Sequence, residues 1–293
     1  HNAWLADVDL GVQEVITWTA RDGLEIEGIL VRPMDGNGEP APLIVSVHGG
    51  PESNLSNGWN TRYASRGQVA AGRGYAVLLP NYRGSTGRGL EFAASSFGDP
   101  AGAEFDDVID GIDHLIDAGI ADGDRVGVTG GSYGGYATYW LSTYYSDRFA
   151  AGVGFVGVSD LVSKRYLTDI PYEDEYVHMG LKVSESLDLM RERSPVTYAD
   201  RCKTPLLILH GDADPRVHPS QSQEMYRALK MAGHEQVRLV WYPGEGHGNS
   251  RRFGREDYVV RTLRWFDYFM KPGGAVEGMP AVDLSGELGL IEE

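Results

Sequence analysis

The stretch VGVTGGSYGGYATYW, residues 126–140, decides the fold. It opens with a short apolar, β-branched run at residues 126–129, which predicts a buried strand, and a helix is expected over residues 136–145. Between them, Ser132 lies on a sharp strand-to-helix turn that presents its hydroxyl. Gly130 and Gly134 flank the serine at two residues on either side, where a β-carbon would obstruct such a tight turn.

Strands and helices alternate on both sides of this stretch. We expect strands at residues 14–19, 24–31, 43–47, 76–79, 126–129, 151–156, 206–209 and 237–242, and helices at residues 61–71, 104–118, 136–145, 221–231 and 256–270. The Asp22-Gly23 turn between the first two strands predicts an N-terminal antiparallel hairpin. The rest of the pattern predicts an α/β fold, with a mostly parallel twisted sheet covered by helices on both faces.

Two segments break this alternation. Residues 159–193 are polar and rich in tyrosine and acidic side chains, so we expect a lid-like insertion within one domain that covers residues 13–271. Residues 272–293 are rich in glycine and acidic, and we expect a flexible tail.

The composition excludes several classes of partner. The chain carries 26 basic and 42 acidic residues, a net charge of -16, whereas binding to nucleic acid or an anionic membrane needs clustered Lys and Arg. We expect a soluble protein with no membrane span, because no apolar run is long enough to cross a bilayer. Cys202 is the only cysteine, which rules out an intrachain disulfide. The chain begins at His1, so the lack of a signal peptide does not decide between a cytoplasmic and an exported protein.

A serine becomes a nucleophile when a base takes its proton and a carboxylate orients that base. On folds with this kind of turn the chain order is serine, acid, histidine. His218 begins a helix four residues after Asp214, and His234 is expected at the opposite end of the sheet. His247 follows a strand in a Gly-rich loop at the edge where Ser132 emerges, so we predict that His247 is the base.

The acid is expected in HGDADPRVH, residues 210–218. Asp212 and Asp214 both follow the same strand, and their positions alone do not separate them. We favour Asp214, because Pro215 rigidifies its turn while Asp212 suits a loop-capping role. His210 ends a strand and no second cluster has the spacing of zinc ligands, so we predict no metal and no cofactor.

Two backbone N–H groups are expected to bind an oxyanion. The N–H of Tyr133 follows the serine at a helix N-terminus. The other donor is expected from the loop His48-Gly49-Gly50-Pro51, whose glycines let the backbone approach a carbonyl closely. We expect the His48 side chain to be structural.

Together the motifs resemble the catalytic domain of the prolyl oligopeptidase family (S9) of serine peptidases, closest to acylaminoacyl-peptidase and dipeptidyl-peptidase-like members. The resemblance runs from Trp18 to Met270 and implies an α/β-hydrolase fold. The matching stretches are HGGP at 48–51, NYRGSTG at 81–87, GDP at 98–100, GGSYGG at 130–135, RSPVTYA at 193–199, TPLLILHGDAD at 204–214 and YPGEGHG at 242–248.

The resemblance implies a complete catalytic set. It makes Ser132 the nucleophile, Asp214 the acid and His247 the base. It also places the oxyanion donors at the N–H groups of Tyr133 and Gly50.

Substrate binding is expected in two places. Related enzymes use an arginine two residues after the acid to bind a backbone carbonyl of the substrate, and Arg216 holds that position here, with a structural salt bridge as the alternative role. In the lid-like segment we expect Tyr166, Tyr172 and Tyr176 to line a pocket for the side chain before the scissile bond. Acidic residues 173–175 are expected to attract positive charge on a substrate, unless the segment is simply a solvated loop with packed aromatics.

The family resemblance also implies an N-terminal β-propeller that screens substrates by size. This chain has no such domain, and residues 1–12 are typical of the junction where a propeller would end. We therefore expect an excised or cleaved catalytic domain that can associate with a propeller, with a relative that never carried one as the alternative.

The expected function is hydrolysis of aminoacyl or acyl-aminoacyl peptide bonds through an acyl-enzyme. A carboxylesterase with the same triad is the first alternative, and a non-catalytic binding module on the same fold is a remote one. Neither the preferred residue, exo- or endopeptidase selectivity, nor the oligomeric state follows from the sequence.

Overall fold

The computed structural model describes residues 3, 7–34, 36, 38–58 and 66–272. Its strands form one eight-stranded sheet. The strand order is β1-β2-β4-β3-β5-β6-β7-β8. The β1–β2 and β2–β4 pairs are antiparallel and all other pairs are parallel, which confirms the predicted α/β fold and its N-terminal hairpin. The strands are β1 Gln13–Thr19, β2 Glu25–Val31, β3 Ala41–Val47, β4 Ala76–Asn81, β5 Ala121–Gly131, β6 Ala151–Phe155, β7 Leu206–Gly211 and β8 Val237–Tyr242.

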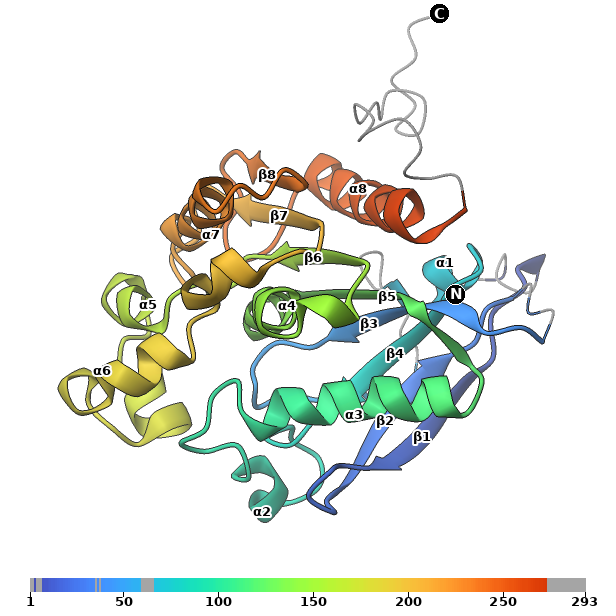
Figure 1. The fold of residues 1–293 in the computed structure, drawn as a ribbon, viewed down its shortest axis with the longest axis horizontal. Helices are drawn as coiled ribbons and strands as arrows, with labels where there is room; N and C mark the ends of the chain where they lie inside the picture. The colour runs from blue at the N-terminus through green and yellow to red at the C-terminus, as the bar shows by residue number, and fades with distance from the viewer. Residues whose placement is uncertain (1–2, 4–6, 35, 37, 59–65, 273–293) are drawn as a thin grey trace, which may run out of the picture.

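Helices cover both faces of the sheet (Figure 1). Alternate residues of β7 show the division, because Leu206 and Ile208 pack with α4 and α7, whereas Leu207 and Leu209 pack with α8. The helix α3 lies on the first face and α1 on the second. In the described part of the chain, no helix has both the length and the apolar character needed to cross a membrane. These helices are α1 Arg66–Ala71, α3 Ala103–Asp117, α4 Tyr133–Tyr144, α7 Ser220–Met231 and α8 Arg252–Met270.

One tryptophan fixes the hairpin to the helix α3. The Trp18 ring lies between Gly28 of β2 and Gly111 of α3, where an added β-carbon would come within 3.0 Å and 2.8 Å of the ring, respectively. Its Nε1–H donates to the carbonyl of Asp107 at 2.9 Å. The buried indole therefore sets how closely β1, β2 and α3 pack.

The segment expected to be lid-like is mostly helical. It lies between β6 and β7 and contains α5 (Leu161–Leu167), a short π-helix (Asp174–Met179) and α6 (Val183–Glu192). Asp160 caps α5 by accepting from the N–H groups of its first turn. In Figure 1, α5 and α6 lie together at one side of the molecule, next to α7, whose Gln221 donates to the Ser163 hydroxyl of α5 at 2.7 Å.

The expected tail and the expected helix at 61–71 fall only partly within the described residues. Residues 273–293 lie outside them, and of the expected helix only Arg66–Ala71 is described. Of the expected junction, residues 1–2 and 4–6 also lie outside the described residues.

The helix α4 begins at Tyr133, three residues earlier than its sequence predicts. The reason is close backbone contact, because an added β-carbon at Gly134 would lie 2.2 Å from the carbonyl oxygen of Val47 in β3. At Gly135 it would lie 2.6 Å from the Cα of Gly157. The glycines that predict a turn therefore also let a helix start directly against the sheet.

Replacing Gly134 with alanine tests this contact. Alanine is favoured over glycine by about 1 kcal/mol inside a helix, but the backbone overlap should outweigh that gain. We expect Gly134→Ala to lower the free energy of unfolding by about 2–3 kcal/mol in urea denaturation. Gly58→Ala is the control, because the nearest atom to its added β-carbon is 3.8 Å away. Equal stability of the two variants would contradict the proposed contact.

Candidate active site

Three loops at the carboxyl edge of the sheet bring Ser132, Asp214 and His247 together. They follow β5, β7 and β8, respectively. The Ser132 Oγ lies 2.9 Å from His247 Nε2, and His247 Nδ1 lies 2.8 Å from Asp214 Oδ2. A nucleophile bonded to a base that a carboxylate orients is the arrangement of a serine hydrolase.

The backbone of Ser132 is strained in the manner the turn requires. Its φ is 60° and its ψ is -121°, values that residues other than glycine rarely adopt. Its N–H donates to the Phe155 carbonyl at the end of β6 (3.0 Å), and its own carbonyl accepts from the N–H of Tyr136 (2.9 Å). These two bonds connect the serine to the sheet on one side and to the first turn of α4 on the other.

Asp214 is buried and is fully supplied with donors. Its Oδ1 accepts from the N–H groups of Arg216 (2.8 Å) and Val217 (3.1 Å). Its Oδ2 accepts from His247 and also lies 3.3 Å from Nε2 of His210. Burial alone would raise the pKa of Asp214, but the hydrogen bonds from His210 and His247 prevail and hold that pKa well below its usual range. The carboxylate is thus charged where it meets the imidazole.

Asp212 has a separate place in the same loop. Its Oδ1 accepts from the N–H of Gly244 at 2.6 Å, which joins the loop after β7 to the loop after β8. The structure therefore brings Asp214, and not Asp212, to His247.

Sequence reasoning did not identify Glu245, which anchors the loop that carries His247. Its buried carboxylate accepts from the N–H groups of Ser250 (2.8 Å) and Arg251 (3.0 Å) just before α8. Its position two residues before a histidine in a Gly-rich loop was the only sequence signal. His247 therefore lies on a loop that Glu245 joins by hydrogen bonds to the residues just before α8.

His48 is packed as a structural residue. Its ring stacks on Tyr82 with centroids 4.5 Å apart, Nδ1 donates to the Gly49 carbonyl, and Nε2 lies 2.9 Å from the Ser85 hydroxyl. Burial lowers the pKa of His48 to about 4, so the ring is neutral. This packing fixes the start of the loop that leads to Gly50.

A cavity of about 270 Å³ opens beside Ser132. Both residues expected to donate to an oxyanion, Tyr133 and Gly50, line it together with Arg216. The Arg216 side chain is half-exposed, and its Nε lies 2.6 Å from Asp169 Oδ1, so the guanidinium is held at the mouth. The remaining lining residues are Tyr136, Val158, Leu161, Lys164, Ile170, Glu173, Asp174, His178 and Val217.

A family model described as the prolyl oligopeptidase family matches residues 60–273. The chain belongs to the prolyl oligopeptidase family. This confirms the resemblance drawn from the sequence motifs, and it agrees with the arrangement of Ser132, Asp214 and His247.

Individual relatives are similar over most of this chain. The Bacillus subtilis protein named "Uncharacterized peptidase YuxL" is 37% identical over 91% of this chain and 40% of its own length. Dipeptidyl aminopeptidase BIII of Pseudoxanthomonas mexicana is 40% identical over 76% of this chain and 33% of its own. The solved acylaminoacyl peptidase of Pyrococcus horikoshii has a TM-score of 0.84 at 29% identity and covers 97% of this chain and 45% of its own. The chain thus spans less than half the length of these family members.

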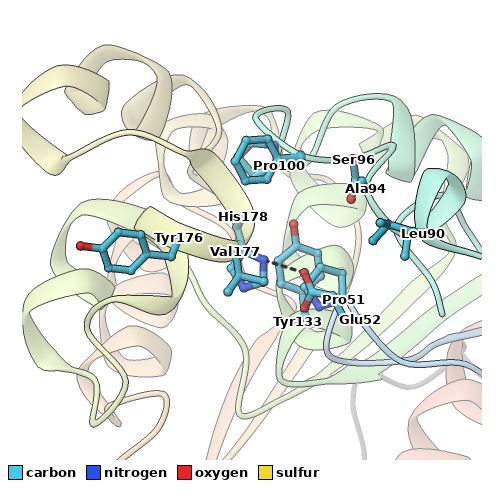
Figure 2. Close-up of a pocket in the computed structure, with 12 residues that line it drawn as sticks. Pro51, Glu52, Leu90, Ala94, Ser96, Pro100, Tyr133, Tyr176, Val177 and His178 are labelled. Atoms are coloured by element: carbon cyan, nitrogen blue, oxygen red, sulfur yellow. Dashed lines mark ion pairs between the residues drawn. The ribbon is translucent and has the colours of Figure 1, made fainter.

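The three tyrosines expected to line the substrate pocket do not lie in the cavity beside Ser132. Tyr166, Tyr172 and Tyr176 are 72%, 66% and 71% exposed. The helix α5 turns Leu161 and Lys164 toward the cavity, which leaves Tyr166 on its solvent side. Tyr176 lines a neighbouring cavity of about 240 Å³ instead, and in Figure 2 its ring points away from the other labelled side chains. The aromatic wall of the cavity comes instead from α4, in the residues just after Ser132.

The acidic run at 173–175 is neutralised by the chain itself. Asp174 Oδ2 lies 2.9 Å from Lys164 Nζ, and both side chains are buried. The Glu173 carboxylate is 3.5 Å from the same ammonium, and Glu175 is 3.6 Å from Arg165. These pairs account for the acids without a charged substrate. Ligand atoms of Glu173, Asp174 and His178 also lie within 4.8 Å of one another, a spacing that could hold a metal ion, and Lys164 Nζ lies within 3.5 Å of both carboxylates.

His178 connects the inserted segment to the loop after β3. In Figure 2 the His178 ring faces Glu52, with Nδ1 3.1 Å from Glu52 Oε1, and Nε2 lies 3.7 Å from Glu173 Oε2. Burial alone would lower the pKa of His178, but the bonds to Glu173 and Glu52 prevail and raise it to about 9. His178 and Tyr133 line both the cavity beside Ser132 and the second one of about 240 Å³, whose other lining residues include Glu52, Leu90 and Tyr176.

The raised pKa of His178 predicts a pH-dependent contribution to stability. The folded pKa lies above the ordinary value of 6.5, so the contribution is complete below about pH 6.5 and is lost as the pH rises through 9. We expect the difference in unfolding free energy between wild type and His178→Gln to shrink between pH 6.5 and 9.5, as measured by urea denaturation. His218→Gln, at an exposed histidine, is the control. A difference that stays constant over this range would contradict the ion pair.

Proposed function

We propose that residues 13–271 form the catalytic domain of a serine peptidase, in which Ser132 is the nucleophile, His247 the base and Asp214 the orienting acid. The observation that carries the proposal is the unbroken hydrogen-bonded chain from the Ser132 hydroxyl through the imidazole to a buried carboxylate. Membership of the prolyl oligopeptidase family supports it independently.

The geometry supports a two-step acyl transfer. His247 Nε2 takes the proton as the Ser132 Oγ attacks the substrate carbonyl, and the Asp214 carboxylate stabilises the imidazolium that forms. The N–H groups of Tyr133 and Gly50 bind the oxyanion. His247 then passes the proton to the leaving amine, and water releases the acyl group by the same steps in reverse.

The proposed substrates are peptides with an aminoacyl or acyl-aminoacyl group before the scissile bond. The relatives named dipeptidyl aminopeptidase and acylaminoacyl peptidase support this class. The cavity beside Ser132 takes the side chain before the scissile bond, and Arg216 at its mouth binds a backbone carbonyl. Because the chain spans less than half of these relatives, we further propose that it acts together with a propeller domain.

Loss of the nucleophile should abolish turnover. We expect Ser132→Ala to lower kcat by roughly 10⁴ to 10⁶-fold on an N-acetyl-aminoacyl p-nitroanilide or an aminoacyl p-nitroanilide. A fluorophosphonate should label the wild type at Ser132 and leave the variant unlabelled. Near-wild-type turnover by the variant would refute the assignment, and wild-type activity on a p-nitrophenyl ester alone would indicate a carboxylesterase.

The two aspartates of the HGDADPRVH loop make a matched pair. Asp214→Asn keeps the shape of the side chain but removes the charge beside His247, and we expect kcat/KM to fall by roughly 10⁴-fold. Asp212→Asn keeps an oxygen that can accept from the N–H of Gly244, so we expect a loss of less than about 10-fold. A larger loss of kcat/KM for Asp212→Asn than for Asp214→Asn would instead identify Asp212 as the acid.

A further inference from the structure

Glu104 is a buried acid that lies next to the site but has no part in the proposed steps. It is in the first turn of α3 and is 1% exposed. Its Oε1 accepts from the hydroxyl of Tyr133 at 2.6 Å and from the N–H of Ala101 at 2.8 Å. Its Oε2 has no hydrogen-bond partner among the described residues.

The partner of this acid is the residue directly after the nucleophile. Tyr133 is the first residue of α4, its ring lines both cavities, and its N–H is a proposed oxyanion donor. The ring packs against Phe105, Tyr136 and His178 with centroids 5.9, 5.2 and 5.8 Å away. These ring contacts are not hydrogen bonds, so the bond to Glu104 supplies the directional restraint on the Tyr133 side chain.

The charge state of Glu104 suits this place. Burial raises its pKa to about 8, although the bonds from Tyr133 and Ala101 act in the opposite direction. At neutral pH the carboxyl is therefore mostly protonated. A neutral acid accepts the hydrogen bond from the Tyr133 hydroxyl and adds no negative charge near the position where the oxyanion develops.

We propose that Glu104 is a positioning residue for the reaction, which acts through the Tyr133 hydroxyl to hold the Tyr133 backbone N–H in line with the oxyanion. The inference rests on the proposed function, because it assumes that Ser132 attacks a carbonyl. It assigns to Glu104 a role in the transition state in addition to its bond to Ala101 at the start of α3.

An oxyanion donor is used mainly in the transition state, so a misplaced N–H lowers kcat more than it changes KM. Complete loss of one donor costs about 10² to 10³-fold in kcat. We expect a donor that is present but less firmly positioned to lower kcat by about 10-fold.

Three variants distinguish an effect of the Glu104–Tyr133 hydrogen bond on catalysis from an effect on stability alone. Tyr133→Phe removes the hydroxyl but keeps the ring, the N–H and the Glu104–Ala101 bond. Glu104→Leu removes the acceptor from both partners. Glu104→Gln keeps a neutral acceptor of the same shape. Tyr75→Phe is the matched control, because the Tyr75 hydroxyl donates to a carboxylate at 2.8 Å, that of Asp267 in α8, and Tyr75 does not line the cavity beside Ser132.

We expect Tyr133→Phe and Glu104→Leu each to lower kcat about 10-fold, with KM changed by less than about 3-fold. The double variant Tyr133→Phe/Glu104→Leu should have the same kcat as Glu104→Leu alone, because both changes break the same hydrogen bond. Glu104→Gln should stay within about 3-fold of wild type. Tyr75→Phe should lower the melting temperature without lowering kcat.

The rate of fluorophosphonate labelling is the second readout, because the phosphonyl oxygen occupies the oxyanion site whatever the preferred peptide. Absence of wild-type labelling at Ser132 would refute the proposed function, and the inference with it. If the wild type is labelled normally and Tyr133→Phe has the same labelling rate and kcat, the inference is overturned while the proposed function stands. It would also be overturned if Glu104→Gln were as impaired as Glu104→Leu. Should Glu104→Leu fail to fold, Tyr133→Phe and Glu104→Gln still decide the question.

Discussion

The close contact between the backbone of α4 and that of β3 is the constraint on which the rest of the structure depends. At Gly134 no side chain fits between the helix and the carbonyl of Val47, so α4 starts directly at the sheet. This start forces Ser132 into its strained conformation and directs its hydroxyl outward at the carboxyl edge. It also places the N–H of Tyr133 beside that hydroxyl. The positions of the proposed nucleophile and of one proposed oxyanion donor thus follow from one steric condition.

The parts of the molecule that could be predicted from sequence are those set by local pattern and chain order. Ser132, Asp214 and His247 each lie in a loop directly after a strand, so the alternation of strands and helices placed them at one edge. The side chains of the inserted segment could not be placed in this way. Which face of α5 turns inward depends on the pairing of Lys164 with Asp174, two residues separated by a loop.

Buried polar residues beside the site were the second group that could not be predicted from the sequence. Glu104 lies in the first turn of a helix, where an acid is common because it complements the helix dipole. His178 lies in a polar segment that resembles a solvated loop. Only the packing around them shows that one contacts Tyr133 and the other contacts Glu52. Such roles depend on contacts between segments, and no local pattern encodes them.

The inserted segment between β6 and β7 carries its own set of buried ion pairs, centred on Lys164, Asp174 and His178. Leu161, Met179 and Met190 of the same segment are also buried in the apolar cluster that includes β3 and β5, so both the ion pairs and the core hold the segment in place. The segment supplies one side of the cavity beside Ser132 but none of the three residues in the Ser132–His247–Asp214 chain. Under the proposed function, the residues of the acyl transfer and one side of the substrate cavity therefore come from different stretches of the chain. We therefore expect substitutions among the cavity-lining residues of 159–193 to change selectivity while the Ser132–His247–Asp214 chain keeps its geometry.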